Sequence, residues 1–184
     1  MDLKELLVYL AEANRHADNS PLSKTKLLKL AYLAELFFYR KHRERLTGAK
    51  WIYHYYGPYV FGYEKILEEY PFQVEQTQYD VDKEATLVKL DSEFPGSTRV
   101  ALDTATILNR VIADFAREDL KDVLDYVYFE TEPMAKAESR GDDLDFNVSL
   151  DASRYNVVPK TVDKKTISKL KAKYKKLSKD ARRI

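Results

Sequence analysis

The stretch that decides the fold reads Ser23-Lys-Thr-Lys-Leu-Leu-Lys-Leu-Ala-Tyr-Leu-Ala-Glu-Leu-Phe-Phe-Tyr39, and Trp51-Ile-Tyr-His-Tyr-Tyr-Gly-Pro-Tyr-Val-Phe-Gly62 follows soon after it. The first part has apolar residues at helical spacing, and Ser23 suits the position of an N-cap. The second part is rich in aromatic and branched residues, which favours a strand, and Gly57-Pro58 interrupts it. An amphipathic helix followed by an aromatic strand suits a rigid binding surface, and no catalytic group stands out in it.

The flanking sequence predicts further elements on both sides. Asp2 and Glu5 have the spacing of a capping box at the start of a first helix. Pro58 suits the first turn of another helix, which we expect to reach about Tyr70 with Phe61 facing inward. Residues 72–79 and 85–90 alternate weakly and predict a hairpin, and helical spacing returns near 102–115 and 120–127.

These elements predict a single mainly helical α+β domain, with helices packed around a small antiparallel sheet. We place this domain at residues 1–158, followed by a basic amphipathic helix at 159–184. A chain of 184 residues is long enough for one such core. It has no cysteine, no apolar run of membrane-spanning length and no signal-peptide pattern at its start, so we expect a cytoplasmic protein.

The last 26 residues differ from the rest in charge. Residues 159–184 carry a net charge of +9, and the preceding residues carry −8. Apolar residues in this tail repeat at heptad spacing, and lysines fill most other positions. The tail could fold onto its own acidic body, dimerise or become ordered on a partner, and we favour docking on an acidic surface. The basic residues expected to take part include Lys169, Lys173 and Lys176.

Three blocks of this sequence resemble the Panacea domain, also called the SocA-like antitoxin domain. They are Lys26–Ala34, which is similar to a family helix, Tyr56–Val60 with its Gly-Pro pair, and Thr131–Ala137. The third block has Glu132 and Met134 where the family has His and Trp. The resemblance covers roughly residues 5–150 and implies an antitoxin that binds its partner toxin directly. It also implies structural roles for Leu27, Leu30, Tyr32, Thr131 and Pro133.

We find no sign of catalytic, metal or cofactor chemistry. The three histidines lie in separate predicted elements without a metal-ligand spacing, and phosphate-binding and nucleophile-elbow motifs are absent. Residues 143–154 begin like a calcium loop, but Val148 replaces the required glycine and Arg154 the required glutamate. The sequence therefore favours a protein that is not an enzyme and needs no cofactor.

The aromatic cluster is the candidate partner-binding site. Tyrosine and tryptophan provide large contact areas at low entropic cost, although core packing explains any single tyrosine better and the cluster as a whole equally well. We expect Gly57 and Pro58 to set a bend in the backbone. The candidate contact residues are Trp51, Tyr53, Tyr55, Gly57, Pro58 and Tyr59.

Two other functions remain open at the level of sequence. The first predicted helices form a loose helix-turn-helix pattern, and Lys24, Lys26, Lys29 and residues 40–45 could contact the phosphates of DNA. A basic patch formed by these residues would favour a DNA-binding regulator. The other function is that of an adaptor that delivers a toxin to a protease.

Overall fold

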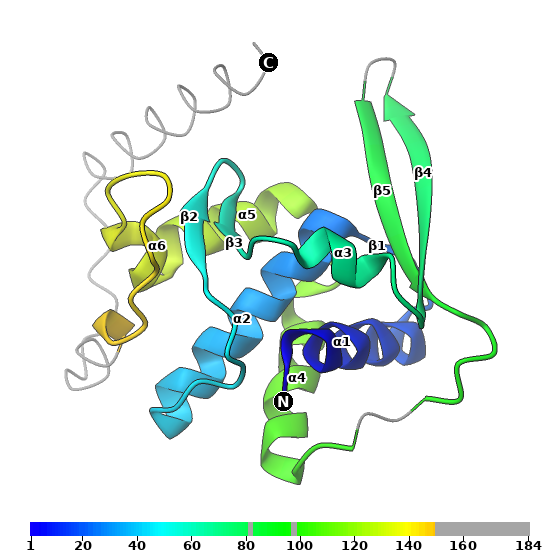
Figure 1. Cartoon of the computed structure of the whole chain (residues 1–184), viewed down its shortest axis with the longest axis horizontal. Helices are drawn as coiled ribbons and strands as arrows, with labels where there is room; N and C mark the ends of the chain where they lie inside the picture. The colour runs from blue at the N-terminus through cyan, green and yellow to red at the C-terminus, as the bar shows by residue number, and fades with distance from the viewer. Residues whose placement is uncertain (81–82, 97–98, 150–184) are drawn as a thin grey trace.

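Helix α2 (Lys24–His42) lies at the centre of the fold and contacts helices α1, α4 and α5 and strands of both sheets (Figure 1). The computed structural model describes residues 1–80, 83–96 and 99–149. The helix begins where the sequence predicts, because the Ser23 hydroxyl accepts a hydrogen bond from the backbone N–H of Lys26 at 3.2 Å. Leu28, Leu30 and Leu33 point to different sides of the helix and are all buried, so α2 is covered on more than one side.

The other helices pack around α2. The predicted capping box at the start of α1 is confirmed: Asp2 accepts from the Glu5 N–H, and Glu5 accepts from the Asp2 N–H, both at 2.8 Å. The helices besides α2 are α1 (Leu3–Ala17), α3 (Tyr63–Leu67), α4 (Leu102–Phe115), α5 (Leu120–Glu130) and α6 (Glu132–Lys136).

A three-stranded antiparallel sheet extends from one side of the helices (Figure 1). Its strands are β1 (Leu22–Ser23), β4 (Phe72–Asp80) and β5 (Lys83–Leu90), in the order β1-β5-β4. The predicted hairpin is therefore confirmed, and Val74 pairs with Val88 near its base.

A second, two-stranded sheet consists of β2 (Ile52–His54) and β3 (Gly57–Tyr59). The prediction of a helix from Pro58 to Tyr70 is wrong, because the Gly-Pro pair begins a strand and only α3 is helical. Tyr53 lies opposite Pro58, but its backbone groups point away from β3. The Tyr53 N–H donates to the backbone oxygen of Asp142, and the Tyr53 oxygen accepts from the N–H of Gly141. Proline therefore fits this strand, since the ladder needs no N–H from it.

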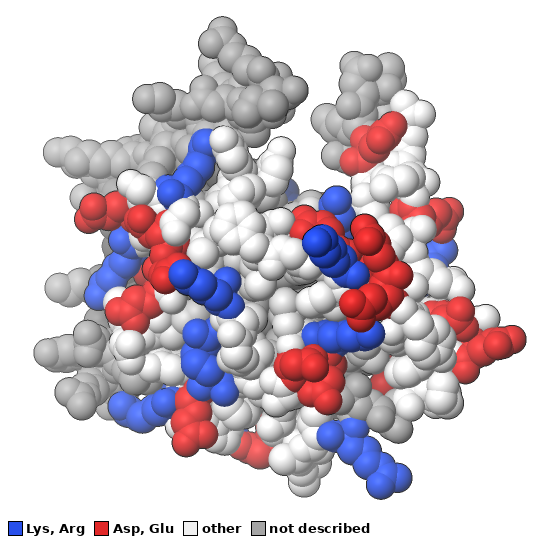
Figure 2. Space-filling model, in the orientation of Figure 1, with Lys and Arg blue, Asp and Glu red and all other residues white. Residues whose placement is uncertain are grey.

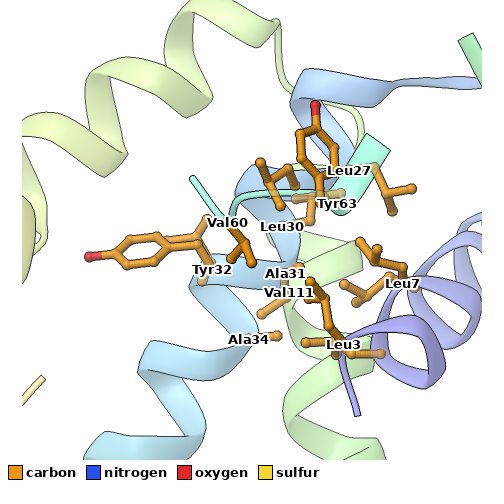
Figure 3. Close-up of a cluster of buried hydrophobic side chains, with 14 of the residues drawn as sticks. Leu3, Leu7, Leu27, Leu30, Ala31, Tyr32, Ala34, Val60, Tyr63 and Val111 are labelled. Atoms are coloured by element: carbon orange, nitrogen blue, oxygen red, sulfur yellow. The ribbon is translucent and has the colours of Figure 1, made fainter. Parts of the chain in front are cut away.

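The core between α1, α2 and α4 combines large and small side chains. Leu3 and Leu7 of α1 face Ala31 and Ala34 of α2, and Val111 comes from α4 (Figure 3). Small residues on α2 let the neighbouring helices approach closely, and leucines fill the space beside them. The predicted fold class, a mainly helical α+β domain, is confirmed, while the predicted C-terminal helix lies outside the described residues.

Candidate functional site

Helix α2 holds the β2–β3 hairpin and the chain after α5 in place through two buried polar contacts. The Lys29 ammonium donates to the backbone oxygen of Pro58 at 2.7 Å. Three residues further on, the hydroxyls of Tyr32 and Thr131 lie 3.1 Å apart and share a hydrogen bond. Lys29 and Tyr32 of α2, which belong to the first of the three sequence blocks, thus bind the second block at Pro58 and the third at Thr131. The predicted structural residues Leu27, Leu30, Tyr32, Thr131 and Pro133 are all buried.

The backbone of the hairpin is constrained at its turn. Gly57 has a φ of 87°, in the left-handed region that glycine adopts at little cost. The Tyr128 hydroxyl, from α5, donates to the backbone oxygen of Tyr55 at 3.1 Å. A Cβ atom on Gly57 would lie 3.5 Å from the Tyr128 ring, which is ordinary contact, so the conformation and not lack of space favours glycine.

The prediction that the side chains of Trp51 and Tyr53 lie on the contact surface is wrong, because both are buried. Trp51 is 2% exposed and Tyr53 is 4% exposed. The Trp51 ring packs edge-on against Tyr32, with 5.5 Å between centroids, and Tyr53 packs edge-on against Tyr128 at 6.4 Å. The successive residues Trp51, Ile52 and Tyr53 point to opposite faces of the strand and are all buried, so both faces are covered here. Residues 141–144 pair with the edge of the strand that β3 leaves free. Gly57 and Pro58 are also buried and act through the backbone.

Exposed and half-buried aromatic side chains of the hairpin and of the residues just after it form a surface that we call the hairpin face, defined as His54, Tyr55, Tyr56, Tyr59 and Phe61. Phe61 is 73% exposed, which corrects the prediction that it faces inward, and Tyr56 is 57% exposed. The half-buried Tyr59 ring stacks on His54 at 4.6 Å and meets Phe61 edge-on at 5.6 Å. Of the predicted contact residues, only Tyr55 and Tyr59 belong to this face.

Polar and cation–π contacts fix two side chains of the hairpin face, those of Tyr59 and Tyr55. The Tyr59 hydroxyl donates to both carboxylate oxygens of Glu64 at 2.9 and 3.0 Å. The Arg140 guanidinium lies over the Tyr55 ring, 3.5 Å from its centroid. Side chains held in this way lose little further freedom on binding.

The ionisable groups near the hairpin are shifted by burial. Burial and the bond to Glu64 raise the pKa of Tyr59 to about 12. Burial, with the nearby charge of Lys29, lowers the pKa of His54. Burial lowers the pKa of Lys29 itself to about 7. These groups make the site less charged near neutral pH than its composition suggests.

The basic residues named for DNA binding do not gather into a patch. Lys29 is buried, and the Lys26 ammonium donates to the backbone oxygens of Ala116 and Glu118 at 2.6 and 2.5 Å. Arg40 forms an ion pair with Glu132 at 2.5 Å. Arg45 binds the buried Glu35, and Lys41 binds Asp103.

Basic and acidic side chains alternate on the face shown in Figure 2. This dispersal disfavours DNA binding by the described residues, because a duplex attracts a contiguous basic surface.

The third block shows what the two departures from the family pattern do here. Glu132, in place of His, accepts the ion pair from Arg40, and Met134, in place of Trp, is 4% exposed. Glu132 therefore pairs α6 with α2, and Met134 is part of the hydrophobic core.

Within residues 1–80, 83–96 and 99–149, no group of three or more His, Asp and Glu side chains could hold a metal ion. In the same ranges, every helix is too short or too polar to cross a membrane. The predicted tail residues Lys169, Lys173 and Lys176 lie outside the described part of the chain.

Comparison with known proteins identifies one family. The family model described as antitoxin SocA-like, Panacea domain, matches residues 27–134, which is more than half of the chain. The match includes the second block, all but the first residue of the first block and residues 131–134 of the third, and it is narrower than the predicted 5–150. Curated proteins and solved structures were also compared, and neither comparison found a match.

Proposed function

The chain belongs to the family of SocA-like antitoxins with a Panacea domain, and from this premise we propose that it neutralises a partner toxin by direct protein–protein binding. We propose the hairpin face as the surface that makes the contact. The observation that carries this assignment is the exposure of Tyr56 and Phe61 on a hairpin whose backbone is bonded to α2 and α5 from behind.

The physical argument rests on exposure and rigidity together. Soluble proteins expose single apolar side chains routinely, but a group of adjacent aromatic rings is typical of an interface. The bonds from Lys29 to Pro58 and from Tyr128 to Tyr55 keep this backbone in one conformation. A preorganised aromatic surface binds a partner without the entropic cost of ordering a loop.

The first test is co-purification of the tagged full-length chain from its native host, followed by expression of what is recovered. We expect one stoichiometric protein that stops growth when expressed alone and is harmless when the chain is co-expressed. Recovery of no such protein, or of one whose toxicity the chain does not relieve, would contradict the proposal. If the partner disappears from cells that express the chain and returns when proteases are inhibited, the chain acts as an adaptor instead.

The second test assigns the surface. The double variant Tyr56→Ala/Phe61→Ala should lose protection against the toxin while the chain stays folded, since both side chains are exposed. Its matched control is Tyr70→Ala/Leu102→Ala, which removes two side chains of 62% and 84% exposure outside the hairpin face. Full protection by the first variant, or loss of protection with both, would contradict the assignment.

A further inference from the structure

A pocket of about 270 Å³ lies beside the hairpin face, where α2, the hairpin and α3 meet. Its walls include the rings of Tyr59 and Tyr63, and its charged lining groups are Lys24, Lys29 and Glu64. Tyr56 and His54 of the hairpin face also line it, so a partner bound to that face would lie across the pocket.

Lys29 is the unusual group in this pocket. It is 2% exposed, and its ammonium, which has three donors, makes one described hydrogen bond, to the uncharged oxygen of Pro58. Among the described residues no carboxylate lies within ion-pair distance of it. A fully buried lysine without a counter-charge is rare, because removing the ammonium from water costs free energy that an anion normally offsets.

Glu35, another buried charged residue of α2, has the partners that a buried charge normally needs. Glu35 is 0% exposed, and its carboxylate accepts from Arg45 at 2.7 Å, from the backbone N–H of Leu46 and from both the N–H and the hydroxyl of Thr47. Glu35 is thus fully paired within the chain. Lys29 has no such set of partners, although it borders open space.

We propose that this pocket receives a carboxylate side chain of the partner protein, an aspartate or a glutamate, which forms an ion pair with the Lys29 ammonium. This inference rests on the proposed function and adds the chemistry of one contact. The aromatic walls would shield the pair from water, and apolar neighbours of the acidic residue would lie on Tyr56 and Phe61.

A carboxylate suits the pocket better than a phosphate group. One buried ammonium balances a single negative charge, and the Glu64 carboxylate in the lining repels a second. Lys24, from the first turn of α2, adds attraction for an incoming anion.

Binding of a carboxylate to Lys29 has a consequence for pH. The pKa of Lys29 is about 7 because the ammonium is desolvated, and an anion beside it would raise that value. The titratable groups that line the pocket with it come from α2 (Lys24), the hairpin (His54, Tyr56 and Tyr59) and α3 (Tyr63 and Glu64), and the Tyr128 ring of α5 lies beside Gly57. Burial lowers the pKa of His54 and raises those of Tyr59 and Tyr63, so none of these three changes charge between pH 7 and 9. Affinity should therefore fall above pH 7, by up to about tenfold per pH unit.

The test uses the full chain with ¹³C-labelled lysine and 3-phenylpropionate as the probe. Lys29→Met identifies the Lys29 signal by its loss, and Lys65→Met, on the exposed side of α3, is the matched control. We expect millimolar probe to raise the midpoint of the Lys29 titration by at least about one pH unit. The uncharged analogue 3-phenylpropionamide should leave it unchanged.

Several outcomes would overturn the proposal. The first is a shift of the Lys29 titration midpoint that is equal for the acid and the amide. The second is a larger shift of this midpoint with inorganic phosphate than with the acid. The third is binding of the acid to Lys29→Met as strong as to the wild type. The comparison of acid with amide on the wild-type chain needs no variant, so misfolding of Lys29→Met could not produce the first outcome. Thermal unfolding of Lys29→Met, in which methionine keeps the length of the side chain, checks that the variant is folded.

The same probe separates this inference from the proposed function. No toxin is present, so a negative result removes the carboxylate pocket and leaves the growth assay untouched. Once the toxin is purified, its affinity for the wild type should decline from pH 7 to 9, and its affinity for Lys29→Met should not. A chain that fails to protect cells but binds the probe would contradict the antitoxin role alone.

Discussion

At the scale of single residues, Lys26 and Lys29 of α2 bind backbone oxygens of segments that are distant in sequence. Lysines of an amphipathic helix are usually solvated. Lys26 instead bonds the carbonyls after α4, and Lys29 lies under the hairpin. A lysine between two leucines on a helix with apolar residues on several sides was the available signal. The spacing alone could not reveal it, because the hairpin that covers Lys29 is distant in sequence.

Lys29 should make the folded chain more stable as the pH rises, whereas a lysine paired with a carboxylate makes it less stable. Its pKa is about 7 in the folded chain and 10.5 in its ordinary state, so the unfolded chain binds more protons between these values. The destabilising effect of Lys29 is therefore complete below pH 7 and declines as the pH rises toward 10.5.

We expect Lys29→Met to be more stable than the wild type at pH 6.5. The difference in the free energy of unfolding should shrink by up to about 1.4 kcal/mol per pH unit above pH 7. Urea unfolding of both proteins at pH 6.5, 7.5 and 8.5 measures it. A difference that stays constant over this range would mean that Lys29 keeps its ordinary pKa.

Gly57 is the residue whose backbone conformation the hairpin requires. With φ at 87°, Gly57→Ala should lower the free energy of unfolding by about 1 kcal/mol, and a branched residue such as valine by more, with loss of toxin neutralisation. Gly48→Ala is the matched control, because a Cβ atom there meets nothing within 4 Å and its φ is not positive. Equal stability of the two alanine variants in urea would show that the turn tolerates a side chain.

At the scale of elements, the sequence predicts correctly the helix starts and the hairpin that depend on a few neighbouring residues. The capping box at Asp2, the cap at Ser23 and the β4–β5 hairpin are all decided within a few residues, and the structure confirms them. The β2–β3 hairpin was missed because Gly57-Pro58 looks like a break. Its second strand is possible only because Tyr53 bonds to residues 141–142, almost ninety positions later. The exposure of Phe61 follows from the same missed hairpin.

The junction between α2 and α4 depends on one side chain. The Lys26 ammonium satisfies the carbonyls of Ala116 and Glu118 at the C-terminal end of α4, where a cation also favours the helix dipole. Lys26→Met should cost about 2 kcal/mol of unfolding free energy. Chemical denaturation checks this value, with Lys65→Met as an exposed control expected to change little. Equal stability of the two variants would mean that water replaces these bonds without cost.

At the scale of the whole molecule, charge is divided between the body and the tail. Residues 1–158 carry −8 and residues 159–184 carry +9. In the described part, several basic groups form ion pairs with acidic ones, among them Arg40, Lys41 and Arg45. Composition predicted this polarity, but the pairing partners come from distant segments and could not be predicted from it. The boundary at residue 158 remains our proposal.

Removal of residues 160–184 tests the role that we propose for the tail. If the tail docks on an acidic surface, the truncated chain should bind the toxin more weakly or unfold more easily. The effect should be largest at low salt and fade near 0.5 M, where charges are screened within a few ångströms. Unchanged affinity and unchanged stability at 20 mM salt would contradict docking.

The central claim is that the hairpin face binds the toxin, and titration calorimetry with the purified toxin tests it most directly. The account predicts that Tyr56→Ala/Phe61→Ala weakens the affinity by about 100-fold, as expected for aromatic side chains at the centre of an interface. Tyr70→Ala/Leu102→Ala should bind like the wild type. Wild-type affinity of Tyr56→Ala/Phe61→Ala, with a loss in the control variant, would contradict the claim and place the contact elsewhere on the molecule.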